Sequence, residues 1–395
     1  MKLGLFSMPC HPPRRPHAQT FDEDLELLVL ADQLGYDEAW LGEHYSSTWE
    51  NIPAPDLVIA QAFALTRNIR LGTGVSCIPN HNPAQLAHRI AQLDVMGKGR
   101  FMWGVGVGAF PGDAILFEIP QDGTHRRVTH ENVDAVLRIW AHGEDGFAWR
   151  SEERPQFNFT IPNREDWRGL GFHMKPWTRP HPPIAVAGFS RSSTTLRWAG
   201  EHGWIPMSIH FVNTEDLVGH WRAYEEEALA NAQKPRRSEW RIARDIYVAD
   251  TDEQARQEVL SGSLAEAYRQ YFFPLLKSFN MTFVWKDDPD MRDEDITVEH
   301  VLNPPRGIVG SPDTVARRLR ELYDEVGGFG GLLMLCYDWE GEEGPRWRRS
   351  MELLVKEVMP QIADLTGEAV GARASSVPAT GQLPGKSAGQ TRGGR

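Results

Sequence analysis

The sequence predicts an α/β protein folded as a (β/α)8 TIM barrel with long insertions in its βα loops. The main signal is an alternation in which short apolar runs of strand length are followed by segments with apolar residues at helical spacing. Four such units occupy about the first 140 residues, which is typical of a parallel sheet with right-handed crossovers. A sheet of this kind can be open or closed, and the continuation to eight units favours the closed barrel.

The expected elements follow one another in order along the chain. Strands are expected at residues 3–7, 38–42, 69–76, 101–107, 183–187, 204–207, 240–248 and 331–336. Helices are expected at residues 22–34, 55–66, 83–96, 126–141, 192–201, 214–232, 252–268, 312–325 and 346–363. Gly35 is a helix-ending signal, and Pro83 stands at the first helical position, where proline is favoured.

The barrel is expected to form one domain over residues 1–366. Two stretches rich in aromatic residues and proline, 143–182 and 270–305, interrupt the alternation, and long βα loops of a barrel form lids over its functional face. Residues 367–395 turn to Gly, Ala, Ser, Thr and Pro, a composition that predicts a disordered tail. Aromatic residues of the two insertions are candidates either for a substrate site or for ordinary packing: Trp149, Phe157, Phe172, Trp177, Phe272 and Trp285.

Composition excludes several classes of partner. The chain of 395 residues has a formal net charge of −12 and no basic block, so a nucleic acid or an anionic membrane surface is not expected to bind. No apolar run reaches the roughly 18 residues that span a bilayer. Cys10, Cys77 and Cys336 are scattered, which argues against a disulfide framework or a structural zinc site. The histidines lack metal-ligand spacing, so no metal is expected, and we expect a cytoplasmic protein that handles small molecules.

Two polar residues end a strand that is otherwise expected to be buried. Glu43 and His44 follow the apolar stretch Trp40-Leu41-Gly42. At the carboxyl end of a barrel strand the chain reaches the functional face, where such local violations of the apolar pattern are expected. Both residues are therefore candidate catalytic residues. Glu43 is expected to orient or charge the His44 imidazole, the alternative being a bond to a neighbouring loop.

A glycine-rich stretch ends the fourth expected strand. Residues 104–109 match the loose dinucleotide-binding pattern G-x-G-x-x-A, but a Rossmann fingerprint follows the first strand and opens a helix. The better interpretation is a strand end without side chains, against which a flat ligand or a phosphate can lie, including at Gly106.

Several hydroxyl groups gather at the start of the fifth expected helix. Gly188-Phe189-Ser190-Arg191 precedes Ser193, and one interpretation is ordinary N-capping. The other is a phosphate site made of backbone N–H groups, the helix dipole and serine hydroxyls, with help from the Arg191 charge. Neither a GxSxG elbow nor a Walker loop occurs in the sequence, so a cofactor is expected to supply the chemistry.

Taken together, these segments resemble the bacterial luciferase-like flavin-dependent monooxygenases. The matching stretches, in order, are 40–44, 71–74, 79–83, 92–94, 99–101 leading to 104–106, 309–312, 328–330 and 358–360. The order of the motifs from residue 1 to about residue 365 carries the resemblance. Glu43-His44-Tyr45-Ser46 with Trp49-Glu50, and Tyr337-Asp338-Trp339, make the chain similar to the limonene-monooxygenase-like branch.

The resemblance implies a TIM barrel that binds reduced FMN supplied by a separate flavin reductase, with FAD or F420 less expected. In the family, O2 adds at the flavin C4a to give a peroxide, which passes one oxygen atom to an apolar organic substrate by hydroxylation, epoxidation or Baeyer–Villiger insertion. A homodimer is also implied. The alternatives are an F420-dependent oxidoreductase on the same barrel and a non-catalytic flavin-binding barrel.

Site residues are implied position by position. His44 corresponds to a histidine near the flavin that donates or accepts a proton. Gly74-Val75, followed by Ser76, corresponds to a non-prolyl cis peptide beneath the flavin ring. Flavin phosphate is implied near Gly188, Phe189, Ser190 and Ser193. The position of the luciferase phosphate-binding arginine holds Val107, so that Arg191, another arginine or the backbone is expected to take over its role.

Overall fold

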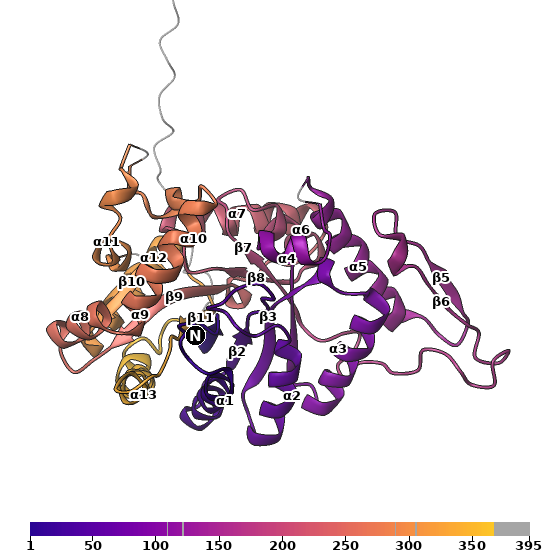
Figure 1. Ribbon diagram of the computed structural model, residues 1–395, viewed down its shortest axis with the longest axis horizontal. Coiled ribbons are helices and arrows are strands. Elements are labelled where there is room, and N and C mark those ends of the chain that lie inside the picture. The colour runs from indigo at the N-terminus through magenta and orange to yellow at the C-terminus, as the bar shows by residue number, and fades with distance from the viewer. Residues whose placement is uncertain (109, 121, 289, 305, 367–395) are drawn as a thin grey trace, which may run out of the picture.

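Eight parallel strands close into a barrel in the computed structural model, which describes residues 1–108, 110–120, 122–288, 290–304 and 306–366 (Figure 1). The expected tail at 367–395 lies outside the described residues. Neighbouring strands follow the order β1-β2-β3-β4-β7-β8-β9-β11, and β11 pairs back onto β1. The predicted (β/α)8 barrel is confirmed.

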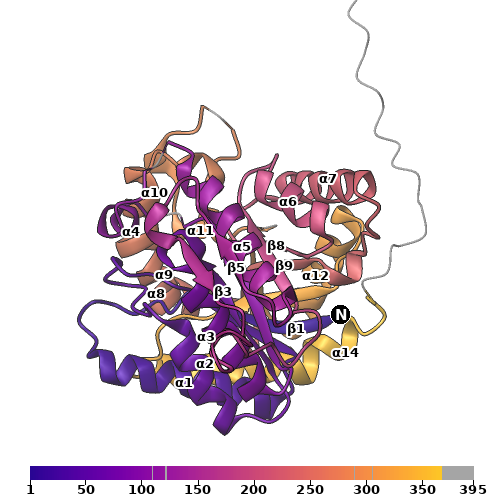
Figure 2. The ribbon, with the colours of Figure 1, turned by 90° about the vertical axis from the view of Figure 1, so that its right-hand side faces the viewer.

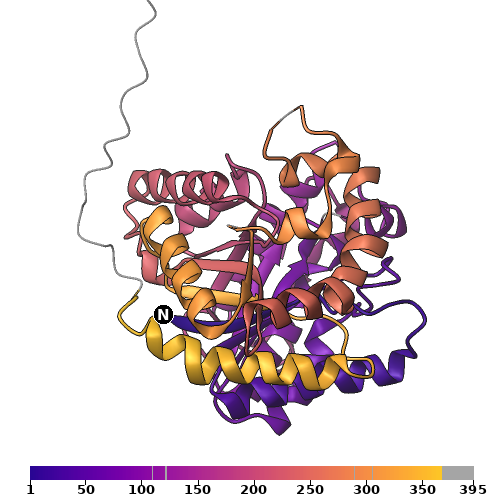
Figure 3. The same cartoon turned by 90° about the vertical axis from the view of Figure 1, so that its left-hand side faces the viewer.

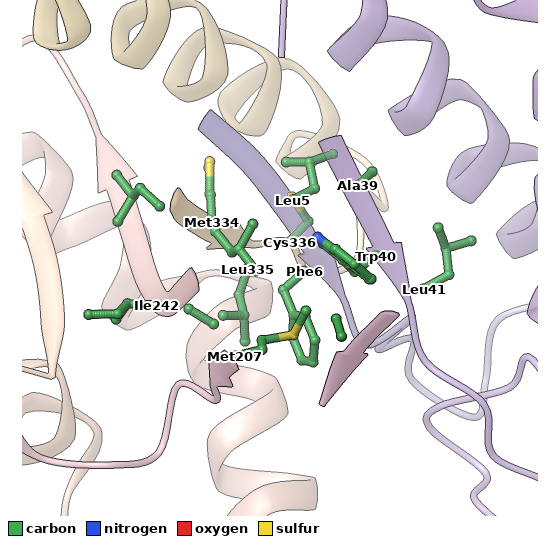
Figure 4. Close-up of a cluster of buried hydrophobic side chains, with 14 of the residues drawn as sticks. Leu5, Phe6, Ala39, Trp40, Leu41, Met207, Ile242, Met334, Leu335 and Cys336 are labelled. Carbon is green, nitrogen blue, oxygen red and sulfur yellow. The ribbon is translucent and has the colours of Figure 1, made fainter. Parts of the chain in front are cut away.

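The barrel strands lie close to their expected positions. They are β1 (Lys2–Ser7), β2 (Glu38–Leu41), β3 (Arg70–Cys77), β4 (Phe101–Gly106), β7 (Ile184–Gly188), β8 (Ile205–Ser208), β9 (Arg241–Val248) and β11 (Gly331–Leu335). An additional strand, β10 (Gly307–Gly310), pairs with the second half of β9 and was not predicted. Figure 4 shows Phe6, Trp40, Met207 and Leu335, from four different strands, in one apolar cluster.

Helices surround the strands and occupy most of the expected ranges. They are α1 (His17–Leu34), α2 (Pro55–Leu65), α3 (Pro83–Gly97), α4 (Pro111–Leu116), α5 (Thr124–Ala141), α6 (Thr194–His202), α7 (Thr214–Ala230), α8 (Asp252–Ser261), α9 (Ser263–Ala267), α10 (Phe273–Ser278), α11 (Val298–Leu302), α12 (Pro312–Val326), α13 (Glu343–Leu353) and α14 (Met359–Gln361). The first and last long helices, α1 and α13, lie side by side (Figure 3). Among the described residues, none of the helices combines the length and apolar character needed to cross a bilayer.

The first insertion is not a lid, contrary to the prediction. Residues 143–182 connect α5 to β7, so they form an αβ connection rather than a βα loop. They contain a small antiparallel hairpin, β5 (Phe147–Trp149) and β6 (Phe159–Ile161), which stands beside α5 (Figure 2). Phe172 packs on His88 of α3, with ring centroids 3.9 Å apart, and Thr178 N–H donates to Asp94. The aromatic residues of this insertion therefore do not belong to the site.

The second insertion is helical, so the prediction of an irregular loop at 270–305 is wrong for much of its length. The expected helix 252–268 ends at Gly262, where the backbone is extended, and a new helix begins because Glu343 accepts a hydrogen bond from Ser263 N–H. From α9 the chain passes through the π-helical turn Tyr268–Phe272 into α10. This insertion follows β9 and is a true βα loop, on the carboxyl face of the barrel.

An ion pair lies inside the barrel. The Arg241 guanidinium of β9 donates to both oxygens of Glu38 in β2, at 3.0 and 3.1 Å, and Trp40 Nε1–H donates to the same carboxylate. Burial opposes ionisation of Glu38, but Arg241 outweighs it and lowers the pKa of the carboxyl. Because a buried charge is tolerated only with its partner, this pair ties β2 to β9 across the interior.

A second buried charge network joins the loop after β1 to α1 and to the loop after β11. His11 bonds to Asp338 at 2.6 Å and to Asp24 at 3.2 Å, while Arg15 donates to Glu23 and Asp338. Burial disfavours the charged ring, but the bonds to Asp24 and Asp338 outweigh it and raise the pKa of His11 to about 9. The imidazolium form therefore stabilises the folded protein.

Glu38→Ala is expected to lower the free energy of unfolding by up to about 3 kcal/mol, because it removes the buried carboxylate that pairs with Arg241 and leaves Glu239 as the remaining carboxylate partner of the guanidinium. Urea unfolding followed by circular dichroism measures the change. Glu299→Ala serves as the control, since Glu299 pairs with Arg256 at the surface, and it is expected to cost less than about 1 kcal/mol. Equal effects of the two substitutions would contradict the structural importance of the buried pair.

His11→Gln is expected to destabilise the protein most below about pH 6.5, the ordinary pKa of histidine. Since the folded-state pKa of His11 lies higher, at about 9, the stabilisation of roughly 3 kcal/mol diminishes as the pH rises and is gone above about pH 9. Thermal unfolding of both proteins between pH 6 and pH 9.5 measures this convergence. His17→Gln, at the exposed start of α1, controls for the loss of a histidine; a difference for His11→Gln that grows with pH would refute the assignment.

Candidate active site

Four neighbouring strands end at the same mouth of the barrel with partly exposed, uncharged residues. Val75 lies in β3, Gly106 ends β4 and Val107 follows it, Ala187 lies in β7, and Ile209 follows β8. Three strand spacings of about 4.8 Å make this surface roughly 14 Å wide. It is broad enough for a flat polycyclic ligand.

The end of β3 bulges away from β4 at this surface. Thr73 pairs with Trp103 and Ser76 with Val105, so two residues of β3 oppose one of β4. The Gly74-Val75 peptide bond within the bulge is cis, as the resemblance implied. Ser76 Oγ donates to Thr73 Oγ1 at 3.1 Å, and Thr73 Oγ1 donates to the Gly104 carbonyl. The buried Ser76 hydroxyl is thus used within the bulge, whereas Val75 reaches the surface.

The bulge explains the glycines of β4. A Cβ on Gly106 would lie 2.3 Å from Val75 Cγ2, and one on Gly104 would lie 2.0 Å from the Thr73 carbonyl oxygen. These glycines therefore make room for the neighbouring strand, which is a different reason from the predicted bare surface for a ligand. Val107 is partly exposed beyond them and offers no charge.

The start of α6 holds both a cap and open main-chain donors. Ser193 Oγ accepts from Leu196 N–H and donates to Thr195 Oγ1, whose own hydroxyl donates to the Ala187 carbonyl. Ser193 is therefore an N-cap, and Gly188 is a packing position, because a Cβ there would lie 2.5 Å from Leu196 Cδ1. Ser190 is exposed and Phe189 is partly exposed beside this helix start.

The Arg191 guanidinium is paired with carboxylates of α7 and is not a free charge at the start of α6. Its guanidinium donates to Glu215 and, at 2.8 Å, to Asp216, both in the first turn of α7. The prediction that the Arg191 charge helps to hold a phosphate is corrected accordingly, since two carboxylates already compensate it.

His44 lies at the mouth with one ring nitrogen unpaired. Its ring centroid is 4.1 Å from that of Phe110, and its Nε2 is 3.4 Å from Glu50 Oε2. Nδ1 is buried and has no hydrogen-bond partner among the described residues. Phe110 in turn contacts Phe279, at the end of α10, with centroids 6.4 Å apart. Aromatic rings therefore shield the imidazole from water.

Glu43 does not stand behind His44, so this prediction is corrected. Both of its carboxylate oxygens lie 2.9–3.0 Å from Nε2 of His81, and the two side chains are buried together. Both residues lie in the loop after β2, which ends at Leu41, and this loop turns Glu43 toward His81 and His44 toward Glu50. Glu43 therefore binds a neighbouring loop, which was the alternative.

Three site residues were missed from the sequence. Glu50, after the polar turn, approaches His44, and Asp245, in β9, accepts hydrogen bonds from Tyr268 and Tyr337. Tyr271 of the π-helical turn donates to Glu50 at 2.7 Å. Burial raises the pKa of Asp245. The stretch Trp49-Glu50 is part of the family resemblance. Its place in the sequence gives no indication of a contact with residue 271.

A short α4 helix pins the loop that carries His44. Asp113 accepts from Ser46 N–H at 2.8 Å and from Tyr45 N–H at 3.3 Å. Because α4 follows Phe110 directly, the same helix fixes the ring against His44 and the loop beneath it.

One group of potential metal ligands was not anticipated. Atoms of His11, Glu23 and Asp338 lie within 4.8 Å of one another. Arg15 donates to both carboxylates, and His11 donates to Asp338, so side chains of the protein already supply the positive charge. The geometry is that of the buried ion network described above.

Comparison with known proteins gives long matches. The family described as luciferase-like monooxygenase matches residues 1–328. The chain is 31% identical to 3,6-diketocamphane 1,6-monooxygenase of Pseudomonas putida over 92% of this chain and 98% of that protein. It is 30% identical to limonene 1,2-monooxygenase of Rhodococcus erythropolis over 91% of this chain and 86% of that protein.

A solved structure of a monooxygenase is also similar to this chain. The oxygenating constituent of 3,6-diketocamphane monooxygenase of Pseudomonas putida, a type II Baeyer–Villiger monooxygenase in complex with FMN, superimposes with a TM-score of 0.84. It is 32% identical and covers 91% of this chain and 98% of that chain. The chain therefore belongs to the luciferase-like monooxygenase family, as the order of its motifs predicted.

Proposed function

We propose that the protein is a two-component monooxygenase that uses reduced FMN and O2 to oxygenate an apolar organic substrate. The observation that carries the proposal is a shielded imidazole with a free Nδ1, at a barrel mouth where four strand ends offer a broad uncharged surface. Membership of a monooxygenase family, and a relative of similar length that binds FMN, support it.

The residues at the mouth fit a flavin mononucleotide. Val75, Gly106 and Val107 offer an apolar surface suited to the ring. At the start of α6 the N–H groups of Thr194 and Thr195 have no acceptor within the helix, and together with the helix dipole they suit a phosphate. Ser190 adds an exposed hydroxyl. In this proposal main-chain N–H groups bind the phosphate. They replace the arginine that the resemblance implied at the position of Val107.

His44 is proposed to exchange a proton at Nδ1. Bound reduced flavin supplies the electrons and reacts with O2, while the protein keeps water away and moves protons. Phe110 and Phe279 exclude water above the imidazole. A buried histidine with one unpaired nitrogen is suited to give or take a proton in a general acid–base step.

An apolar substrate is supported by exposed apolar side chains on the βα loops that follow β4 and β9. Ile115 and Leu116 of α4 and Phe283 of the second insertion are strongly exposed, although each is apolar. The relatives named for diketocamphane and limonene act on compounds of this character. Baeyer–Villiger insertion, epoxidation and hydroxylation all remain within the proposal.

The proposal includes a separate flavin reductase, a homodimer and a cytoplasmic location. Exposed Leu57 and Leu65 of α2 and Val95 and Met96 of α3 support a dimer, because these helices are neighbours and apolar side chains on adjoining elements favour association. The three cysteines are buried and unbridged, which supports a reducing compartment.

His44→Ala is expected to lower the rate of substrate oxygenation by about 10²–10⁴-fold, the usual contribution of a proton-transferring side chain. The assay mixes the protein with chemically reduced FMN, 18O2 and candidate ketones and alkenes, and mass spectrometry counts 18O in the product. His17→Ala is the control, with wild-type turnover expected. Unchanged turnover of His44→Ala would contradict the proposed role, and anaerobic turnover with F420 would favour the hydride-transferring alternative.

Ser190→Ala is expected to weaken FMN binding about 3–10-fold, corresponding to one hydrogen bond of roughly 1 kcal/mol, and to leave riboflavin binding unchanged. Riboflavin lacks the phosphate, so the comparison isolates the phosphate contact. Arg191→Gln is expected to change neither affinity by more than about 2-fold, because Glu215 and Asp216 hold that guanidinium. Flavin fluorescence quenching measures the affinities of the wild type and of both variants for FMN and for riboflavin. A selective loss of FMN affinity in Arg191→Gln would contradict the main-chain site.

A further inference from the structure

We infer that Glu50, rather than the adjacent Glu43, is the positioning residue for His44, and that Tyr271 of the second insertion holds Glu50 in place. The inference deepens the proposed function and rests on it for the role of His44. It assigns the proton of the neutral imidazole to Nε2 and leaves the lone pair on Nδ1, the nitrogen that has no partner among the described residues.

Glu50 is fixed from several sides. Its carboxylate is 1% exposed, and Oε2 lies 3.4 Å from His44 Nε2 and 2.7 Å from the Tyr271 hydroxyl oxygen. Its own N–H donates to Ser47 Oγ at 2.9 Å, and its backbone forms a β-bridge with Cys10. Both the backbone and the carboxylate are thereby held, so the position of Oε2 beside the imidazole is determined by the fold.

The hydrogen bonds around Tyr271 have a definite direction. Ser47 Oγ accepts from the N–H groups of Trp49 and Glu50, so its own hydrogen points to the Tyr271 oxygen, 3.0 Å away. The Tyr271 hydroxyl then donates to Glu50. The pKa of Tyr271 is raised mainly by burial and further by the negative charge of Glu50. The phenol therefore stays protonated and can donate a hydrogen bond. The Tyr271 ring also stacks on Trp49, with an interplanar angle of 13°.

The carboxylate decides which tautomer of His44 is stable. A neutral imidazole carries one proton, and a lone pair on Nε2 would face the lone pairs of Glu50 at 3.4 Å. With the proton on Nε2 the same contact becomes attractive, and on further protonation it becomes an ion pair. Nδ1 then bears the lone pair, and it is the nitrogen that has no partner among the described residues. A carboxylate that orients a catalytic histidine in this way is a recurring arrangement.

Glu43 cannot take this role because both of its oxygens are engaged elsewhere. They contact His81 Nε2, and the Glu43 backbone carbonyl accepts from the Cys77 thiol. The two glutamates thus hold two different histidines. Their substitution by glutamine removes the same charge with the same change of shape, which makes them matched variants.

The tautomer can be measured without flavin or substrate. Protein labelled with 15N in histidine is examined by long-range 1H–15N correlation spectra, in which the two neutral tautomers give distinct patterns, and His44→Ala assigns the signals. The wild-type protein is expected to show His44 protonated at Nε2. In Glu50→Gln the carboxamide can donate to the ring, so the His44 pattern is expected to shift toward the Nδ1-protonated form.

Glu43→Gln is the control, and it is expected to move the His81 signals and to leave those of His44 in place. Tyr271→Phe keeps the ring on Trp49 and removes the donor to Glu50, so a smaller shift of the His44 pattern in the same direction is expected. In the oxygenation assay Glu50→Gln is expected to lower kcat about 10–100-fold, with KM changed less than about 3-fold.

A wild-type His44 protonated at Nδ1 would overturn the inference, whether or not any variant folds. It would also be overturned if Glu50→Gln left the His44 pattern unchanged or if Glu43→Gln shifted it. If the spectra agree with the inference while His44→Ala retains full turnover, the positioning by Glu50 stands and the proposed function of His44 fails.

Discussion

Closure of the barrel by β9 is the constraint on which the rest of the structure depends. Residues 241–244 of β9 pair with β11, and the first two of them pair with β8 as well. Residues 245–248 pair instead with the additional strand β10. The first half of β9 therefore closes the barrel between β8 and β11. Its second half leads into the helical insertion at the carboxyl face of the barrel.

Each half of β9 carries a buried ionisable side chain, and the two are stabilised differently, one by an ion pair and the other by hydrogen bonds. Arg241, inside the closed half, is neutralised by Glu38 across the interior. Asp245, at the mouth, accepts from the hydroxyls of Tyr268 and Tyr337, which come from the second insertion and from the loop after β11. Since a buried carboxylate requires hydrogen-bond donors, Asp245 fixes both loops against the barrel.

Buried carboxylates organise the whole mouth by the same rule. Glu43 holds His81, Glu50 accepts from Tyr271, and Asp113 accepts from the backbone of the loop after His44. Each one fastens a loop to a neighbouring element, and Nδ1 of the His44 imidazole is left buried without a partner in the part of the chain that the structure describes. The π-helical turn matters here because it brings Tyr268 to Asp245 of β9 and Tyr271 to Glu50 in the loop after β2.

The barrel and the family could be predicted from the sequence, and so could the place of His44 just after the second strand. Strand and helix periods are local properties of the chain, so the strand that contains Trp40 could be predicted, and the order of the family motifs implied the cis peptide at Gly74-Val75. The place of His44 beside a flavin stays a prediction. The length of local helical order in the second insertion was underestimated, because aromatic residues and proline favour loops only on average.

Partners far apart in the sequence were decided only by the tertiary structure. Glu50 and Tyr271 are separated by 221 positions, and Glu38 and Arg241 by 203. The sequence favoured Glu43 as the neighbour of His44 because it is adjacent, and Arg191 as a free charge because its partners on α7 follow much later. Closure of the barrel brings loops that are distant in the sequence to one mouth, so the choice of partner belongs to the fold.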